Sequence, residues 1–179
     1  MSLLEVLMLY PETFTYDDYT LEEPVTVSVG EQKRIDRFKI AEKYRGKKSG
    51  YVYSMGIQLN SKNAIIKVLY KYAKREHYAI GAPSSLVESG LVQPNPTGLW
   101  VARYDEANND YAVFYTPFRG LPFWDEIEVW IIPYDEDVTI KWYSRLFLIF
   151  DLDRVTEVIR EWMGLVRALE LTKSEARRG

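Results

Sequence analysis

The fold is decided by residues 99–150, which read LWVARYDEANNDYAVFYTPFRGLPFWDEIEVWIIPYDEDVTIKWYSRLFLIF. Four runs rich in aromatic and β-branched residues stand at 99–104, 111–118, 127–134 and 138–150, and short, mostly polar links separate them. Such runs and links are typical of strands joined by hairpins. The sequence therefore predicts an antiparallel four-strand meander at the centre of a single α+β domain that covers residues 1–179.

A mid-chain helix is expected to pack against this sheet. Between residues 61 and 78, apolar side chains recur at steps of three and four residues, which is the period of an amphipathic helix. Ser61 is a suitable N-cap for it. Its outer face would be basic because Lys67, Lys71, Lys74 and Arg75 lie off the apolar stripe.

A long C-terminal helix is predicted over residues 153–178, and its apolar residues are spaced 4, 3, 4 and 3, which is a heptad pattern. Two interpretations stay open. The apolar seam packs on the meander, or it pairs with its own copy in a homodimer. The seam consists of Val155, Ile159, Trp162, Val166 and Leu169.

The N-terminal half divides into two segments. Residues 1–24 form an acidic segment without Lys or Arg. Residues 25–59 contain a β-branched alternating strand at 25–29 and a pattern that indicates a hairpin over 35–59, with its basic turn in solvent. These strands either extend the meander sheet or form a second small sheet.

The distribution of charge is the most informative feature for function. Residues 31–75 hold thirteen Lys or Arg and three acids, a net charge of +10, in a chain whose total is −3. Residues 1–30 carry −6 and residues 76–179 carry −7. Such asymmetry indicates an anionic partner for the middle segment. The alternative is a solvated basic face that folds back onto the acidic segments.

Aromatic residues alternate with these cations, which favours a nucleic acid as the anionic partner. Phosphates attract Lys and Arg, and exposed rings stack on unpaired bases. We therefore expect non-enzymatic binding of single-stranded DNA or RNA, or alternatively a structural or protein-interaction subunit that docks an acidic partner or itself. The candidate binding residues are Lys33, Arg34, Arg37, Lys39, Lys43, Tyr44, Arg45, Lys47, Lys48, Tyr51, Tyr53, Lys67, Lys71, Lys74 and Arg75.

Two short resemblances to known families bear on this expectation. Lys47, Gly50, Tyr51 and Val52 match the RNP1 strand of RNA-recognition motifs, but no helix is expected between 25–29 and 35–40, so that fold is not predicted. What remains is a strand able to stack bases beside a basic turn.

Residues 148–153, which read LIFDLD, are similar to the first motif of haloacid-dehalogenase-type phosphatases and to the paired-Asp strand of archaeal primases. The resemblance implies Mg²⁺-dependent phosphoryl transfer by Asp151 and Asp153 as a minor alternative. The phosphatase motif continues with Gly-Thr, whereas Arg154 and Val155 follow here. The other interpretation is that Asp153 caps the last helix. We expect no enzymatic activity and no cofactor.

Composition narrows the expected setting of the protein. The chain has no Cys and one His, so thiolate metal sites, disulfides and cysteine nucleophiles are excluded. The absence of Cys and the low Asn and Gln count suit a protein from a thermophile. No apolar run approaches the roughly 20 residues that span a bilayer, and the first ten residues lack a basic region. We therefore expect a cytoplasmic protein, archaeal or viral in origin.

Overall fold

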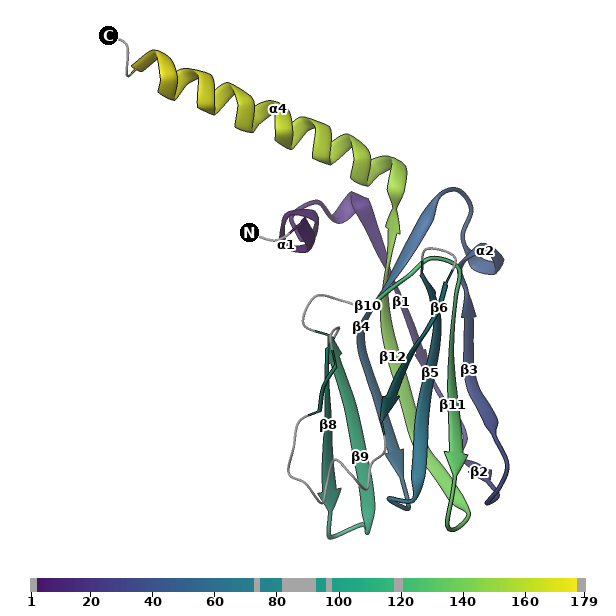
Figure 1. Cartoon of the computed structure of the whole chain (residues 1–179). Helices are drawn as coiled ribbons and strands as arrows, with labels where there is room; N and C mark the ends of the chain where they lie inside the picture. The colour runs from purple at the N-terminus through teal and green to yellow at the C-terminus, as the bar shows by residue number, and fades with distance from the viewer. Residues whose placement is uncertain (1–2, 73–74, 82–92, 96–97, 118–120, 177–179) are drawn as a thin grey trace.

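A computed structural model describes residues 3–72, 75–81, 93–95, 98–117 and 121–176 of the chain. Within these ranges the fold is mostly β, and two antiparallel sheets lie face to face (Figure 1). Short helical segments lie at one end of this sandwich, and a long helix extends from the same end (Figure 1).

The larger sheet contains eight of the described strands in the order β1-β12-β4-β9-β8-β7, with β10 beside β4 and β2 beside β12. Its two longest strands, β4 and β12, pair with each other over most of their length. The strands are β1 (Phe14–Thr20), β2 (Val25–Val27), β4 (Lys48–Leu59), β7 (Gln93–Asn95), β8 (Gly98–Asp105), β9 (Asp110–Pro117), β10 (Leu121–Phe123) and β12 (Val138–Asp151).

The smaller sheet has four described strands in the order β3-β11-β5-β6. Strand β11 (Glu126–Pro133) lies between β3 (Lys33–Lys39) and β5 (Ala64–Tyr72), and β6 (Arg75–Gly81) follows β5. Two strands that are distant in the sequence are therefore held on either side of β11.

The main core lies between the two sheets, and strands with alternating buried side chains contribute to it. On β11, and over residues 64–71 of β5, every second side chain is buried. Three aromatic side chains of this core, Phe123, Phe147 and Tyr143, are completely buried. A second, smaller cluster forms where Leu148 and Phe150 of β12 face away from the main core and contact Leu7 and Val158.

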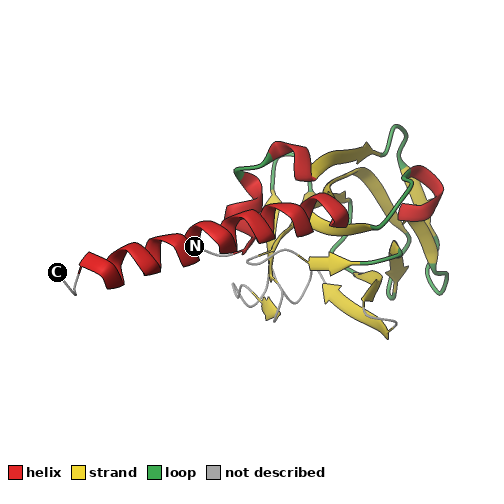
Figure 2. Cartoon of the chain, turned by 90° about the horizontal axis from the view of Figure 1, so that it is seen from above, coloured by secondary structure: helices red, strands yellow, loops and turns green. Residues whose placement is uncertain are grey.

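The helical segments are α1 (Leu3–Met8), the 3-10 turn η1 (Pro11–Thr13), α2 (Ile40–Lys43) and α4 (Leu152–Ala176). Strand β12 runs directly into α4, which then leads away from the sheets (Figure 2). The predicted helix over 153–178 is thus confirmed for residues 153–176, while residues 177 and 178 lie outside the described part of the chain. Its predicted packing on the sheet is limited to its first two turns, where Val155 and Val158 join the smaller cluster.

The four strands predicted between 99 and 150 are confirmed as β8, β9, β11 and β12, but the predicted meander is wrong. Strands β8 and β9 form a hairpin in the larger sheet, whereas β11 pairs with β3 and β5 in the smaller one. The chain crosses from one sheet to the other between β9 and β11 and again between β11 and β12. Because of these crossings, consecutive apolar strands lie in opposite sheets and face each other. The core is therefore enclosed between the two sheets.

The predicted mid-chain helix over 61–78 is wrong, because the described part of this segment forms β5 and the first half of β6. The apolar residues of segment 64–70 fit both the spacing of an amphipathic helix and the alternation of a strand. Ile65, Val68 and Leu69 fit a helical stripe, but Ala64, Ile66, Val68 and Tyr70 also alternate strictly and are the buried residues. The β-branched content of this run and its pairing with β11 decide in favour of a strand.

The predicted hairpin over 35–59 is also wrong. Its two strands, β3 and β4, belong to different sheets, and α2 connects them at one end of the sandwich (Figure 1). Both predicted alternatives for the 25–59 strands hold in part, since β2 and β4 lie in the larger sheet while β3 helps to form a second sheet.

Candidate interaction surfaces

The outer face of the smaller sheet carries several of the predicted binding residues, and acids of β11 neutralise them. Arg34 on β3 pairs with Glu128 at 2.8 Å, and Arg37 pairs with Glu126 at 2.5 Å. From the opposite side, Lys71 on β5 approaches Glu126 at 3.4 Å. An acidic strand thus lies between two basic ones and compensates the charges of Arg34, Arg37 and Lys71.

The remaining predicted cations are distributed over several places. Lys43 pairs with Asp17 at 2.5 Å, Lys47 stands 4.0 Å from Asp153, and Lys48 forms an ion pair with Asp151. Three others, Lys33, Lys39 and Arg45, have no ion-pair partner within the described ranges. Lys67 lies on β5, Arg75 begins β6, and Lys74 is outside the described residues. The predicted basic surface is therefore not one continuous stripe.

The predicted aromatic residues also differ in accessibility. Tyr44 donates its hydroxyl hydrogen to Asp17 Oδ2 at 2.7 Å, and burial together with this carboxylate raises the pKa of Tyr44 to about 12. The ring of Tyr51 is half-buried against Phe150. Tyr53 is half exposed on β4. Of the predicted tyrosines, Tyr53 is thus the one whose ring is most open to solvent.

A buried ionic network joins the two sheets. The guanidinium of Arg145 on β12 donates to Asp17 of β1 at 2.7 Å and to Asp36 of β3 at 2.9 Å. Tyr143 donates to the same Asp36 oxygen at 2.8 Å. Burial opposes ionisation of Asp17, but hydrogen bonds from Lys43 and Arg145 outweigh it and hold its pKa below the ordinary value. Every charge in the network has a partner, which fits a structural role.

A groove of about 380 Å³ opens where α2 meets the start of β4. It is lined by residues of segment 40–48 and by Trp124 and Asp125 from the link between β10 and β11. A backbone hydrogen bond from Ile40 N to Asp125 O at 2.9 Å joins the two lining segments, and one from Trp124 N to Lys71 O at 2.7 Å ties the link to β5. Arg45, which is exposed, and Trp124, which is 54% exposed, both line this groove.

Local backbone geometry explains why Arg45 and Lys47 are exposed beside this groove. Gly46 has a φ of +84°, a left-handed conformation that glycine adopts readily, so the chain turns sharply between them. Leu152 N then donates to Lys47 O at 2.9 Å and ties this turn to the start of α4. The turn is therefore fixed to the scaffold although its side chains reach solvent.

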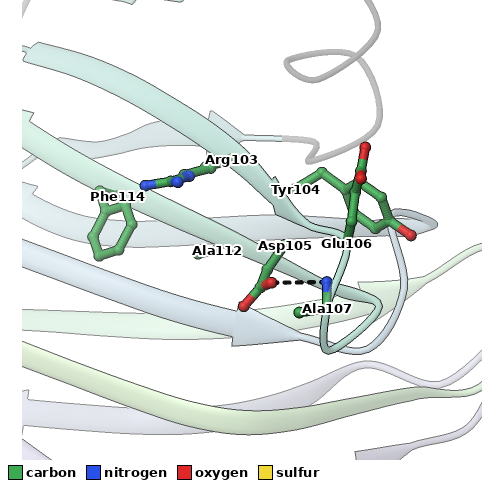
Figure 3. A pocket seen from close by; sticks show the side chains of 7 residues that line it. All are labelled: Arg103, Tyr104, Asp105, Glu106, Ala107, Ala112 and Phe114. Carbon is green, nitrogen blue, oxygen red and sulfur yellow. Dashed lines mark hydrogen bonds between the residues drawn. The ribbon is translucent and has the colours of Figure 1, made fainter.

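A larger hollow of about 610 Å³ lies along the β8–β9 hairpin (Figure 3). Its polar groups serve the hairpin turn itself, since Asp105 accepts hydrogen bonds from Ala107 N at 3.1 Å and from the Asn108 side chain at 2.9 Å. The bond from Asn108 contributes most to a lowered pKa of Asp105. Arg103 and Phe114 stand at its other end (Figure 3).

The two carboxylates of the phosphatase-like stretch are separated by their roles. Asp151 Oδ1 accepts the backbone N–H groups of Asp153 at 3.1 Å and Arg154 at 3.3 Å, while Oδ2 pairs with Lys48. The bond from Lys48 is the main reason that the pKa of Asp151 is lowered. Asp153 is exposed. The N-cap of α4 is therefore Asp151, and the predicted cap at Asp153 is wrong by two residues.

The predicted seam of the C-terminal helix is accessible over most of its length. Val155, Ile159 and Val166 are half-buried, whereas Trp162 is 44% exposed and Leu169 is 62% exposed. The seam is also wider than predicted, because Met163 and Leu165 are exposed beside it.

Sequence reasoning missed Trp124, Met163 and Leu165 as surface residues. A signal existed for Trp124, since a tryptophan between Phe123 and two acids, Asp125 and Glu126, stands in a link rather than in a strand. Which aromatic residues of such links stay exposed depends on the crossing between the sheets.

Among the described residues there is no group of three or more His, Cys, Asp or Glu that could hold a metal ion. The described helices include none that is long and apolar enough to cross a membrane. No protein-family model matches the sequence, and no curated protein matches it.

Proposed function

We propose that this protein binds single-stranded nucleic acid without altering it chemically, and that the groove between α2 and Trp124 is the binding site. The observation that supports the proposal is that an exposed arginine, Arg45, and an exposed tryptophan, Trp124, line the same groove. The proposed site is smaller than the surface predicted from the sequence.

Trp124 and Arg45, which both line the groove, suit different parts of a nucleotide. An indole face stacks on an unpaired base, and a guanidinium presents paired N–H donors to a phosphate. Lys47 lies on the same turn and is exposed, so it can contact the next phosphate along the strand. Lys43 and Lys48 lie close to the same turn. Because they are paired with Asp17 and Asp151, they should contribute less to phosphate binding than Arg45 and Lys47.

Single strands fit the groove better than a duplex. A volume of about 380 Å³ is near the lower end of the roughly 300–1,000 Å³ found for ligand pockets. It can take one base and its phosphate, and stacking on Trp124 requires that the base be unpaired.

The test is a fluorescence-anisotropy titration of labelled single-stranded oligonucleotides at two salt concentrations. The variant Trp124→Ala should weaken binding roughly 5- to 150-fold, because stacking on an aromatic residue contributes about 1–3 kcal/mol per base. The variant Arg45→Ala should reduce the slope of log K against log salt by about 0.7, which corresponds to one phosphate contact on a single strand.

Arg103→Ala is the matched control, because Arg103 is an exposed arginine in the other hollow. It should leave both affinity and salt slope unchanged. Absence of binding by wild-type protein at low salt, or equal loss in Arg45→Ala and Arg103→Ala, would contradict the proposal.

A second candidate function is that of a structural subunit acting through protein association. The wide exposed apolar face of α4 favours it, since monomeric proteins seldom leave such a surface in water. The two functions use different surfaces and are compatible with each other.

A further inference from the structure

The groove proposed as the binding site also contains a carboxylate. Asp125 lines it together with Trp124 and Arg45. Asp125 is exposed, and within the described part of the chain its side chain makes no hydrogen bond and no ion pair. Lys48 also lines the groove, but it is paired with Asp151 instead. The groove therefore offers a ligand a carboxylate that no described residue neutralises.

Backbone hydrogen bonds fix the position of Asp125. Its carbonyl oxygen accepts a hydrogen bond from Ile40 N at 2.9 Å, at the start of α2. Before it in the chain, Trp124 N donates to a carbonyl oxygen of β5 at 2.7 Å. After it, Glu126 is paired with Lys39 at the start of β11. The backbone is thus held at three successive residues, so a ligand meets a site that is already ordered.

The indole and the carboxylate belong to consecutive residues, whose Cα atoms are about 3.8 Å apart. A nucleic acid base is wider than this distance, so one base stacked on Trp124 can present its edge to Asp125. A phosphate is excluded from that place, because two negative charges at close range repel each other. The phosphate therefore belongs beside Arg45, and the carboxylate is left for the base.

The number of N–H donors on the edge of a base decides how well that base fits a carboxylate, whose oxygens only accept hydrogen bonds. The Watson–Crick edge of guanine carries two adjacent donors, N1–H and the N2 amino group, and can give one to each oxygen. Cytosine and adenine each offer one amino group beside an acceptor nitrogen. Thymine and uracil offer one N–H between two carbonyl oxygens, which the carboxylate repels.

We infer that Asp125 makes the groove selective for guanine in a single strand, with its two carboxylate oxygens accepting hydrogen bonds from N1 and N2 of a base stacked on Trp124. The inference rests on the proposed function, since it concerns the same groove. It adds a base preference to stacking and phosphate contacts, which by themselves are largely independent of sequence.

The same contact also favours single strands over a duplex. In a duplex the Watson–Crick edge of guanine is hydrogen-bonded to cytosine, so Asp125 cannot reach it. Only an unpaired guanine can stack on the indole and give both donors to the carboxylate.

The test is a fluorescence-anisotropy titration with short oligothymidylates that carry one substituted base at the centre. Guanine at this position should tighten binding about 5- to 150-fold relative to thymine, the usual discrimination by a bidentate base contact. Hypoxanthine, which lacks the N2 amino group, should lose most of this gain. 7-Deazaguanine should keep it, because its Watson–Crick edge is unchanged.

A variant of the carboxylate tests the role of Asp125 directly. Asp125→Asn keeps the shape of the side chain but replaces one acceptor oxygen with a donor. It should remove the preference for guanine and leave the affinity for oligothymidylate equal or higher, because a negative charge near the phosphates is lost. Glu106→Gln is the matched control, since Glu106 is an exposed acid of the hollow along the β8–β9 hairpin, and it should keep the wild-type preference. Trp124→Ala should weaken binding of every oligonucleotide, with or without guanine.

Equal affinity of the wild-type protein for the guanine and thymine strands overturns the inference and leaves the proposed function standing. The same conclusion follows if hypoxanthine binds as tightly as guanine, or if Asp125→Asn keeps the preference. If no oligonucleotide binds at low salt, the proposed function fails and the inference fails with it. The titration of unsubstituted oligothymidylate therefore distinguishes the two failures.

Discussion

Replacing Arg145 with Met should lower the free energy of unfolding by about 3–5 kcal/mol, the usual cost of removing one partner from a buried ion pair. Arg145 is 6% exposed, and it is the shared partner of Asp17 and Asp36. Without it, Asp36 keeps only its hydrogen bond from Tyr143, so a buried carboxylate loses its counter-charge. Urea unfolding should show a lower midpoint with an unchanged slope.

Two further variants test whether the loss of stability comes from the buried ion pairs of Arg145. Arg34→Met removes an arginine of an exposed pair, with a side chain 44% exposed, and should change stability by no more than about 1 kcal/mol. Adding Asp36→Asn to Arg145→Met should recover part of the loss, because a neutral amide leaves no unpaired charge. If Arg145→Met were as stable as wild type, the network would not hold the two sheets together.

Replacing Gly50 with Ala should destabilise the protein by about 1–3 kcal/mol, although alanine is normally favoured over glycine in a strand. A Cβ at Gly50 would lie 2.2–2.6 Å from three ring atoms of Phe123. That ring is fully buried and packs against Phe147 and Phe38, at centroid distances of 5.0 and 5.9 Å. It cannot move aside without displacing the centre of the core.

A double-mutant cycle separates this clash from other effects. In a Phe123→Ala background, which itself costs about 3–5 kcal/mol, the further change Gly50→Ala should be nearly neutral, because the added methyl then fills space that the ring has left. Gly164→Ala is the control and should have the opposite sign, a gain of about 1 kcal/mol, since Gly164 lies in open space on α4. Additive losses in the cycle would show that Phe123 is not what excludes a side chain at Gly50.

The candidate site was predictable only in part. Arg45, Lys47 and the turn around Gly46 are visible as a basic segment, because local composition marks an exposed turn. The neutralisation of Arg34, Arg37 and Lys71 was not predictable, because it depends on the register of β11 between two strands distant in the sequence. Trp124 joins the site for the same reason, as it arrives from a different part of the chain.

The sequence by itself determined the strands between 99 and 150 and the C-terminal helix, because alternation and heptad spacing are local properties of the chain. Only the tertiary structure decided that residues 64–72 form a strand, since their apolar pattern satisfies both periods and pairing with β11 selects one. It also decided which charges meet. Strand pairing places Glu126 and Glu128 among the cations of β3 and β5, so a segment that is strongly basic in sequence is partly compensated in space.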